Sequence, residues 1–131
     1  MKRIMLDTNV LIALFKGDQQ VADIVSTYDR VLIPTVVLGE FKAGLALDVR
    51  QGHLLRQILN QFLDAPAVEV VSITERTTET YALVYKVLKE KGTPIPQNDL
   101  WIAAMALDSA VELYSRDGHF LEIPLLKLMS V

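Results

Sequence analysis

The sequence predicts an α/β protein built around a mainly parallel sheet. Four short runs are apolar almost throughout, which is typical of strands covered on both faces in a parallel sheet. Segments with helical periodicity fill the intervals between these runs. Strands that alternate with helices indicate α/β units. The chain has 131 residues, of which 51% are hydrophobic and 22% are charged, so we expect a single globular domain over residues 1–131.

The strands are expected at the apolar runs, which are residues 3–6, 30–33, 68–73 and 111–115, with 125–129 as a fifth strand at an edge. Capping and turn residues then place the helices. They are expected at residues 9–16, 35–47 and 51–63, between the cap residue Thr74 and Gly92, and at 99–110. The helix after Thr74 has an expected buried stripe of Tyr81, Val84, Tyr85 and Leu88.

Composition excludes several classes of function. Cysteine is absent, so disulfides, thiolate metal ligands and a cysteine nucleophile are excluded. Asp7 interrupts the first apolar run, which argues against a signal peptide, and no run approaches the ~18 apolar residues of a membrane span. We therefore expect a cytoplasmic protein without a membrane partner. The net charge of −3 disfavours a nucleic-acid binder that relies on lysine and arginine, unless carboxylates gather around divalent cations.

Three aspartates fall at one expected edge of the sheet. Asp7 follows the first strand in IMLDTN, Asp117 follows the fourth strand in SRDGHF, and Asp99 begins the helix that leads into that fourth strand. A fourth acid, Glu40, lies inside the helix TVVLGEFKAGLAL after the second strand. Ligands of open α/β sheets bind at the carboxyl ends of the strands, so we expect these carboxylates to meet at one edge of the sheet.

Each acid taken singly has a structural explanation. Asp7 can cap the helix that follows it, Asp117 can form a turn with Gly118, and a helical glutamate usually faces solvent. Asn98 is the expected N-cap of the last helix, where Asp99 favours the positive end of the helix dipole. A cluster of carboxylates, however, persists only when it is protonated or when cations are bound, because the charges repel. Oxygen ligands without a histidine or cysteine set favour Mg²⁺ or Mn²⁺.

Four motifs in order, IMLDTNVLIAL, IPTVVLGEFKAGL, IPQNDLWIAAMAL and LYSRDGHF, span nearly the whole chain. With these motifs the chain resembles the PIN-domain family of metal-dependent ribonucleases, and within it the VapC-type toxins of toxin–antitoxin pairs. The resemblance implies a three-layer fold with a sheet in strand order 3-2-1-4-5 flanked by helices.

The resemblance also implies roles for individual residues. The positions that match the family's catalytic, metal-holding acids are Asp7, Glu40, Asp99 and Asp117. Polar positions that match residues supporting these acids are Thr8, Asn9, Asn98 and Ser115. Arg116, next to Asp117, is a candidate for contact with the RNA backbone. Trp101 has two open interpretations, stacking on an RNA base or packing against the neighbouring helix.

The implied activity is endoribonuclease cleavage of RNA by metal-activated water, with Mg²⁺ or Mn²⁺ as the cofactor. Ser115 is disfavoured as a nucleophile because neither histidine is placed as its base. The implied partners are an antitoxin protein, whose basic side chain faces the acids, and a second copy of the chain in a homodimer.

Two alternatives stay open, a PIN-fold binding module without turnover and an RNA-processing nuclease without an antitoxin. Two other enzyme classes are disfavoured. A phospho-acceptor domain needs an aspartate after the third strand, where Thr74 and Glu75 stand, and an aspartyl phosphatase usually has a second aspartate at the position of Asn9.

Overall fold

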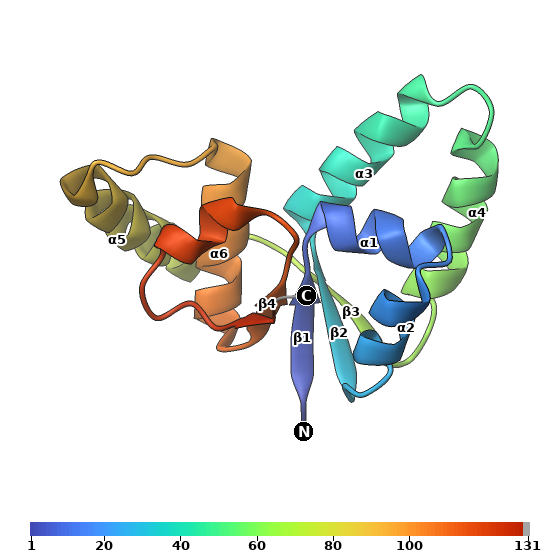
Figure 1. The fold of residues 1–131 in the computed structure, drawn as a ribbon, viewed down its shortest axis with the longest axis horizontal. Helices are drawn as coiled ribbons and strands as arrows, with labels where there is room; N and C mark the ends of the chain where they lie inside the picture. The colour runs from blue at the N-terminus through green and yellow to red at the C-terminus, as the bar shows by residue number, and fades with distance from the viewer. Residues whose placement is uncertain (130–131) are drawn as a thin grey trace.

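Five parallel strands form one sheet at the centre of the molecule (Figure 1). The computed structural model describes residues 1–129, so the last two residues of the expected domain 1–131 lie outside the described residues. The strand order is β3-β2-β1-β4-β5, and each neighbouring pair is parallel. The predicted α/β class and the strand order 3-2-1-4-5 are therefore confirmed.

All five predicted strands are present, with ends that differ by up to three residues. They are β1 (Arg3–Leu6), β2 (Arg30–Pro34), β3 (Val68–Val71), β4 (Glu112–Tyr114) and β5 (Leu128–Met129). The last three residues of β1 have no exposed surface, as expected for the central strand. For β3 the expectation of cover on both faces is wrong. β3 pairs only with β2 at the edge of the sheet, and its Val70 is 44% exposed.

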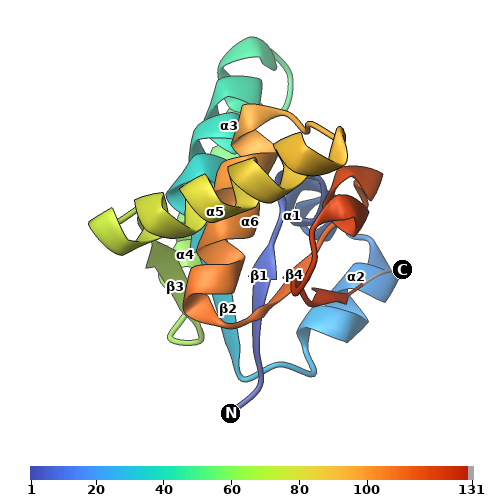
Figure 2. The ribbon, with the colours of Figure 1, turned by 90° about the vertical axis from the view of Figure 1, so that its left-hand side faces the viewer.

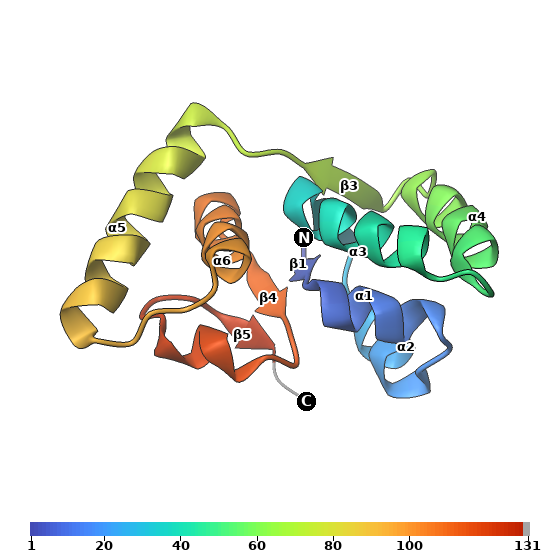
Figure 3. The same ribbon diagram turned by 90° about the horizontal axis from the view of Figure 1, so that it is seen from above.

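Helices cover both faces of the sheet, as Figure 3 shows from above. On one face lie α1 (Thr8–Phe15), α2 (Gln19–Val25), α3 (Thr35–Leu47) and α4 (Gly52–Leu63). On the other face α5 (Glu75–Lys91) passes in front of α6 (Gln97–Ser109), which lies next to the strands (Figure 2). A 3-10 helix, η1 (Gly118–Glu122), follows β4. Over residues 1–129, no helix is both long enough and apolar enough to cross a membrane.

Helix α2 was not expected from the sequence. Gly17 and Asp18 indicate only a turn, and the following segment is short and begins with two glutamines. In the structure Asp18 is the N-cap of α2, because its Oδ1 accepts a hydrogen bond from the backbone N–H of Val21 at 3.2 Å. A side-chain cap thus defines a helix of only seven residues.

The start of α6 corrects the expected cap. Pro96, not Asn98, is the N-cap residue, and no side chain caps this helix. The backbone of Pro96 is extended, with φ −56° and ψ 145°, and α6 begins at the next residue, Gln97. Asn98 and Asp99 therefore both lie in the first turn, where the carboxylate of Asp99 is favoured by the helix dipole.

Helix α5 has both of the predicted end signals. Thr74 forms a capping box with Thr77, and Gly92 ends the helix in the left-handed conformation with φ 73°. Its buried stripe is narrower than expected. Val84 is 7% exposed and buried, whereas Tyr85 is 50% exposed.

The order of the strands determines where a ligand can bind. Chain connections run from β1 to β2 on one side of β1, while β4 lies on its other side. Such a reversal places a crevice beyond the carboxyl ends of β1 and β4. At this point the backbone N–H of Asp7 donates to the carbonyl oxygen of Tyr114 at 3.0 Å. The residues that follow β1 and β4 are therefore held side by side.

The close approach of α3 and α4 yields a stability prediction. A Cβ added to the buried Gly52 would lie 2.5 Å from the backbone carbonyl oxygen of Leu45. We expect Gly52→Ala to lower the free energy of unfolding by about 1–3 kcal/mol, because backbone cannot move aside easily. Gly44→Ala in α3 is the matched control, since a Cβ there meets nothing within 4 Å. It should raise stability by about 0.4–1 kcal/mol. Urea unfolding measures both, and equal effects would contradict the close approach.

Candidate active site

Asp7 is the buried carboxylate at the centre of the site. It follows β1 directly, is the N-cap of α1, and has only 4% of its surface exposed. Its Oδ1 accepts from the backbone N–H of Thr8 at 2.8 Å, and its Oδ2 accepts from the hydroxyl of Ser115 at 2.6 Å. Because both oxygens are held, the orientation of this carboxylate is defined by the ends of β1 and β4.

Glu40 reaches the same edge from α3. The side chain is partly buried, and its Oε1 accepts a hydrogen bond from the hydroxyl of Thr8 at 3.0 Å. Thr8 therefore contacts two acids, through its backbone N–H to Asp7 and through its hydroxyl to Glu40. This bridging residue couples the beginning of α1 to the interior of α3.

The other two acids meet at a histidine. Nδ1 of His119 lies 2.7 Å from Oδ2 of Asp99 and 2.9 Å from Oδ1 of Asp117. Asp117 is the N-cap of η1, and its Oδ1 also accepts from the backbone N–H of His119 at 3.0 Å. The first turn of α6 and the loop after β4 are therefore joined by one imidazole.

Ser115 connects the aspartates on the two sides of the crevice. It is buried at the end of β4, donates its hydroxyl hydrogen to Asp7, and accepts from the backbone N–H of Asp117 at 3.0 Å. A hydroxyl that both donates and accepts a hydrogen bond is poorly placed to act as a nucleophile. This geometry supports the prediction that the chemistry does not use Ser115 as an attacking group.

The electrostatics of the site favour a positive charge near Asp7. Burial raises the pKa of Asp7 above its ordinary value of 3.8, and the charges of Asp99 and Glu40 raise this pKa further. The hydrogen bonds from Ser115 and Thr8 only partly oppose the rise. A neighbouring cation would relieve the repulsion between these carboxylates.

The pKa of His119 is raised for the complementary reason. Its hydrogen bond to Asp99 is the largest cause, and the charges of Asp117 and Asp99 add to it. A protonated imidazole between two carboxylates supplies the positive charge that the cluster favours.

The available donor atoms fit a divalent cation. Over residues 1–129, carboxylate oxygens of Asp99 and Asp117 and a ring nitrogen of His119 lie within 4.8 Å of one another. Asp7 and Glu40 lie outside this group of three, but the charges of Asp99 and Glu40 both raise the pKa of Asp7, so Asp7 and Glu40 act on the same edge. A group of carboxylate oxygens is the donor set that hard divalent ions prefer.

Comparisons with known proteins identify the family. A family model described as PIN domain matches residues 4–126. The chain belongs to the PIN domain family. This confirms the resemblance found in the four sequence motifs.

Relatives of this PIN domain include VapC proteins. It is 30% identical over 116 residues to Ribonuclease VapC5 of Mycobacterium tuberculosis, and the match covers 88% of this chain and 84% of the relative. Its fold is similar to VapBC-1 from nontypeable Haemophilus influenzae, with 28% identity, a TM-score of 0.82 and coverage of 98% and 97% of the two chains. It is also similar to VapBC-5 from Mycobacterium tuberculosis, a member of the VapBC family of toxin–antitoxin systems, at 22% identity, a TM-score of 0.75 and coverage of 100% and 98%.

The four predicted acids of this PIN domain are connected as two pairs. Asp99 and Asp117 meet at His119, and Thr8 links Asp7 to Glu40. Ser115 joins the pairs through Asp7 and the backbone of Asp117. Thr8 and Ser115 donate hydrogen bonds to the acids, as described above. Asn9 is one step removed, because its Oδ1 accepts from the backbone N–H of Arg116 at 3.2 Å. Asn98 is exposed on the first turn of α6. The catalytic and metal-holding roles of all these residues stay predictions.

Two residues of the site region were not found from the sequence. His119 carries little weight in the sequence, because the chain has only two histidines and they form no metal-binding set. Its position two residues after Asp117 was the available signal. Asp18 is the second, since its Oδ2 lies 2.6 Å from the guanidinium Nη2 of Arg116. The predicted RNA contact therefore competes with an ion pair for Arg116.

The raised pKa of Asp7 predicts a pH-dependent stability effect. An acid with a raised folded pKa costs stability above that pKa, and the cost vanishes below the unfolded value of 3.8. We expect Asp7→Asn to raise the urea midpoint of the metal-free protein at pH 7, because asparagine still caps α1 without a buried charge. The gain should shrink as the pH falls towards 4.

Asp18→Asn is the opposite control. The pKa of Asp18 is lowered, chiefly by its hydrogen bond to Arg116, so its charge stabilises the folded state at neutral pH. This variant should lose stability at pH 7. A loss of stability at pH 7 in Asp7→Asn as well would contradict the assigned repulsion.

Proposed function

We propose that this chain is a metal-dependent endoribonuclease and the toxin component of a type II toxin–antitoxin pair. The observation that carries the proposal is the set of four carboxylates beyond the carboxyl ends of β1 and β4, which follow β1, lie in α3 and α6, and follow β4. Two of them share His119, and the charges of two of them raise the pKa of Asp7. Membership of the PIN family and 30% identity to Ribonuclease VapC5 support RNA as the substrate. Likeness to VapBC structures supports an antitoxin protein as the partner.

The carboxylates of Asp7, Glu40, Asp99 and Asp117 are the groups that we propose hold Mg²⁺ or Mn²⁺. A divalent ion bound there supplies Lewis acidity towards a phosphodiester oxygen and lowers the pKa of water. Thr8 and Ser115 hold Asp7 in its orientation, and Thr8 also fixes Glu40. The protein thus contributes a rigid, negatively charged edge rather than a side-chain nucleophile.

His119 gives this edge a second property. Its ring sits between Asp99 and Asp117, so it neutralises part of their repulsion in the metal-free protein. A cation held by Asp99 and Asp117 would have to displace the His119 ring or share the two carboxylates with this ring. We propose that His119 is a positioning residue for both aspartates.

The same electrostatics suit the proposed antitoxin. A basic side chain offered to the acids would compete with the ion and block the site. We also propose that the chain forms a single PIN-like domain over residues 1–131 and acts on cytoplasmic RNA, which cell fractionation can test. The family resemblance implies a homodimer as well, which light scattering can test.

The proposal predicts a metal-dependent loss of function in one variant. Partner-free protein incubated with total cellular RNA and Mn²⁺ should release discrete fragments, and EDTA should abolish them. Asp99→Ala should lower cleavage at least ~100-fold, because it removes one carboxylate of the cluster. Asp64→Ala is the matched control, since Asp64 is an exposed residue at the end of α4.

The controls separate chemistry from folding. Circular dichroism and the unfolding midpoint should show that Asp99→Ala stays folded, and Asp64→Ala should cleave like the wild type. Wild-type activity in Asp99→Ala would overturn the site assignment. Well-folded wild type that cleaves no RNA in any preparation would favour a PIN-fold binding module.

A further inference from the structure

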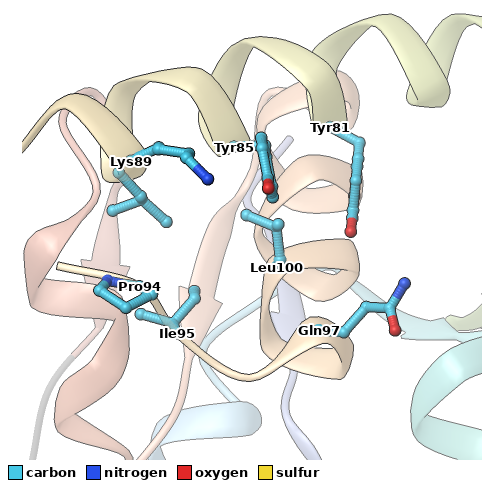
Figure 4. Close-up of a pocket in the computed structure, with 8 residues that line it drawn as sticks. Tyr81, Tyr85, Lys89, Pro94, Ile95, Gln97 and Leu100 are labelled. Atoms are coloured by element: carbon cyan, nitrogen blue, oxygen red, sulfur yellow. The ribbon is translucent and has the colours of Figure 1, made fainter. Parts of the chain in front are cut away.

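Two tyrosine rings on α5 form a slot that faces the start of α6. Tyr81 and Tyr85 lie one helical turn apart, their ring centroids are 6.5 Å apart, and the ring planes differ by only 17°. Figure 4 shows both rings edge-on and side by side. They line an open pocket of about 460 Å³ between α5 and the segment that leads into α6. Small-molecule sites typically fall within about 300–1,000 Å³.

One ring of the slot is packed against α6 and the other is half exposed. Tyr81 also stacks on Trp101 of α6, with ring centroids 3.9 Å apart and planes 27° apart. Trp101 therefore packs against the neighbouring helix, the second of its two interpretations. Within residues 1–129 the only ring stacked with Tyr85 is that of Tyr81, and Tyr85 is 50% exposed. The pair combines a ring that is packed on α6 with a ring that is half exposed.

The spacing of the rings suits a flat aromatic guest. Carbon atoms in contact lie about 3.5 Å apart, so a planar group between two rings needs roughly 7 Å from plane to plane. Tyr81 and Tyr85 lie almost parallel, and their ring planes are separated by no more than the 6.5 Å between the centroids. The exposed Tyr85 side chain therefore has to move outward by at least roughly half an ångström to admit a planar group.

The rim of the pocket carries groups that suit a nucleotide. Nζ of Lys89 lies 5.9 Å from the ring centroid of Tyr85. Among the salt bridges of residues 1–129, none uses Lys89, so its charge is available to a phosphate. Gln97 lines the opposite side, and its amide can donate to and accept from the edge of a base.

The first turn of α6 lies between the pocket and the acidic edge. Gln97 and Asp99 both belong to this turn, with Gln97 in the pocket and Asp99 in contact with His119 of the acidic cluster. Residues two apart are separated by roughly 200° around a helix, so a strand with one base in the slot has to pass around the N-terminus of α6 before its backbone reaches the carboxylates.

We propose that Tyr81 and Tyr85 sandwich one unpaired base of the RNA substrate beside the cleavage site. Lys89 contacts the adjoining phosphate, and Gln97 hydrogen-bonds the edge of the base. This inference rests on the proposed ribonuclease function and deepens it, because it restricts the substrate to RNA that is single-stranded next to the cut. Stacking tolerates every base, so Gln97 is the source of any base preference.

The experiment is a binding titration in EDTA, where no cleavage occurs. A labelled, short single-stranded RNA of mixed sequence is titrated with protein, and fluorescence anisotropy reports affinity. Emission of Trp101, the single tryptophan of the chain, reports events in the slot, because Tyr81 stacks directly on it. We expect saturable binding by the wild type, with a change in Trp101 emission.

Substitutions at Tyr85 separate stacking from other effects. Tyr85→Leu should weaken binding about 5- to 150-fold, the effect of losing one base–aromatic stack. Tyr85→Phe keeps the ring and should bind within about twofold of the wild type. Leu83→Ala is the matched control, because Leu83 is exposed on α5 and does not line the pocket.

The outcomes distinguish the slot from the ribonuclease activity. Unchanged RNA affinity in Tyr85→Leu, together with cleavage by the wild type in Mn²⁺, would overturn the slot alone. A wild type that neither binds nor cleaves RNA would overturn both proposals. Light scattering provides the remaining test. If Tyr85→Leu converts a dimer into monomers without changing RNA affinity, the pocket is an interface between copies and the slot is overturned.

Discussion

Repulsion between carboxylates is the constraint on which this structure depends. Asp7 is almost fully buried, and the charges of Asp99 and Glu40 raise its pKa further. If stability alone had shaped this fold, such groups would be separated or neutralised, because buried charges without partners lower the free energy of unfolding. This chain instead fixes Asp7 with hydrogen bonds from Thr8 and Ser115. Binding of the proposed cation would relieve this repulsion.

The sheet provides the rigidity that this arrangement needs. Residues 4–6 of β1 are fully buried, and the backbone bond from Asp7 to Tyr114 joins the ends of β1 and β4. Apolar packing of the central strand therefore holds a polar edge in place. Helices α3 and α6 deliver Glu40 and Asp99 to this edge from opposite faces of the sheet. Repulsion between the acids cannot drive them apart without disturbing the core.

Local sequence signals predicted the elements that depend on the pattern of apolar residues or on a helix-capping residue. The apolar runs located all five strands, and Thr74 and Gly92 marked the ends of α5. Prediction failed where tertiary context decides. The sequence of β3 is apolar like that of a central strand, yet β3 is an edge strand with Val70 exposed.

The site was predictable to a similar extent. Acids at the ends of parallel strands share an edge whatever the details of packing, so Asp7 and Asp117 could be placed from topology. His119 could not be placed, because its contacts with Asp99 and Asp117 depend on how η1 folds back over the first turn of α6. The stacking of Trp101 on Tyr81 likewise joins two helices and has no local signal.

The central claim is that carboxylates from four segments act as a single cation site. Calorimetric titration of partner-free protein with Mn²⁺ tests it most directly, in the wild type and in Asp7→Asn, Glu40→Gln and Asp99→Asn. We predict saturable binding by the wild type and a loss of at least about tenfold in affinity in each variant, which is the lower bound seen even for residues that only orient metal ligands. Absence of Mn²⁺ binding by folded wild type, or full affinity in the Glu40→Gln and Asp7→Asn variants, would contradict the account.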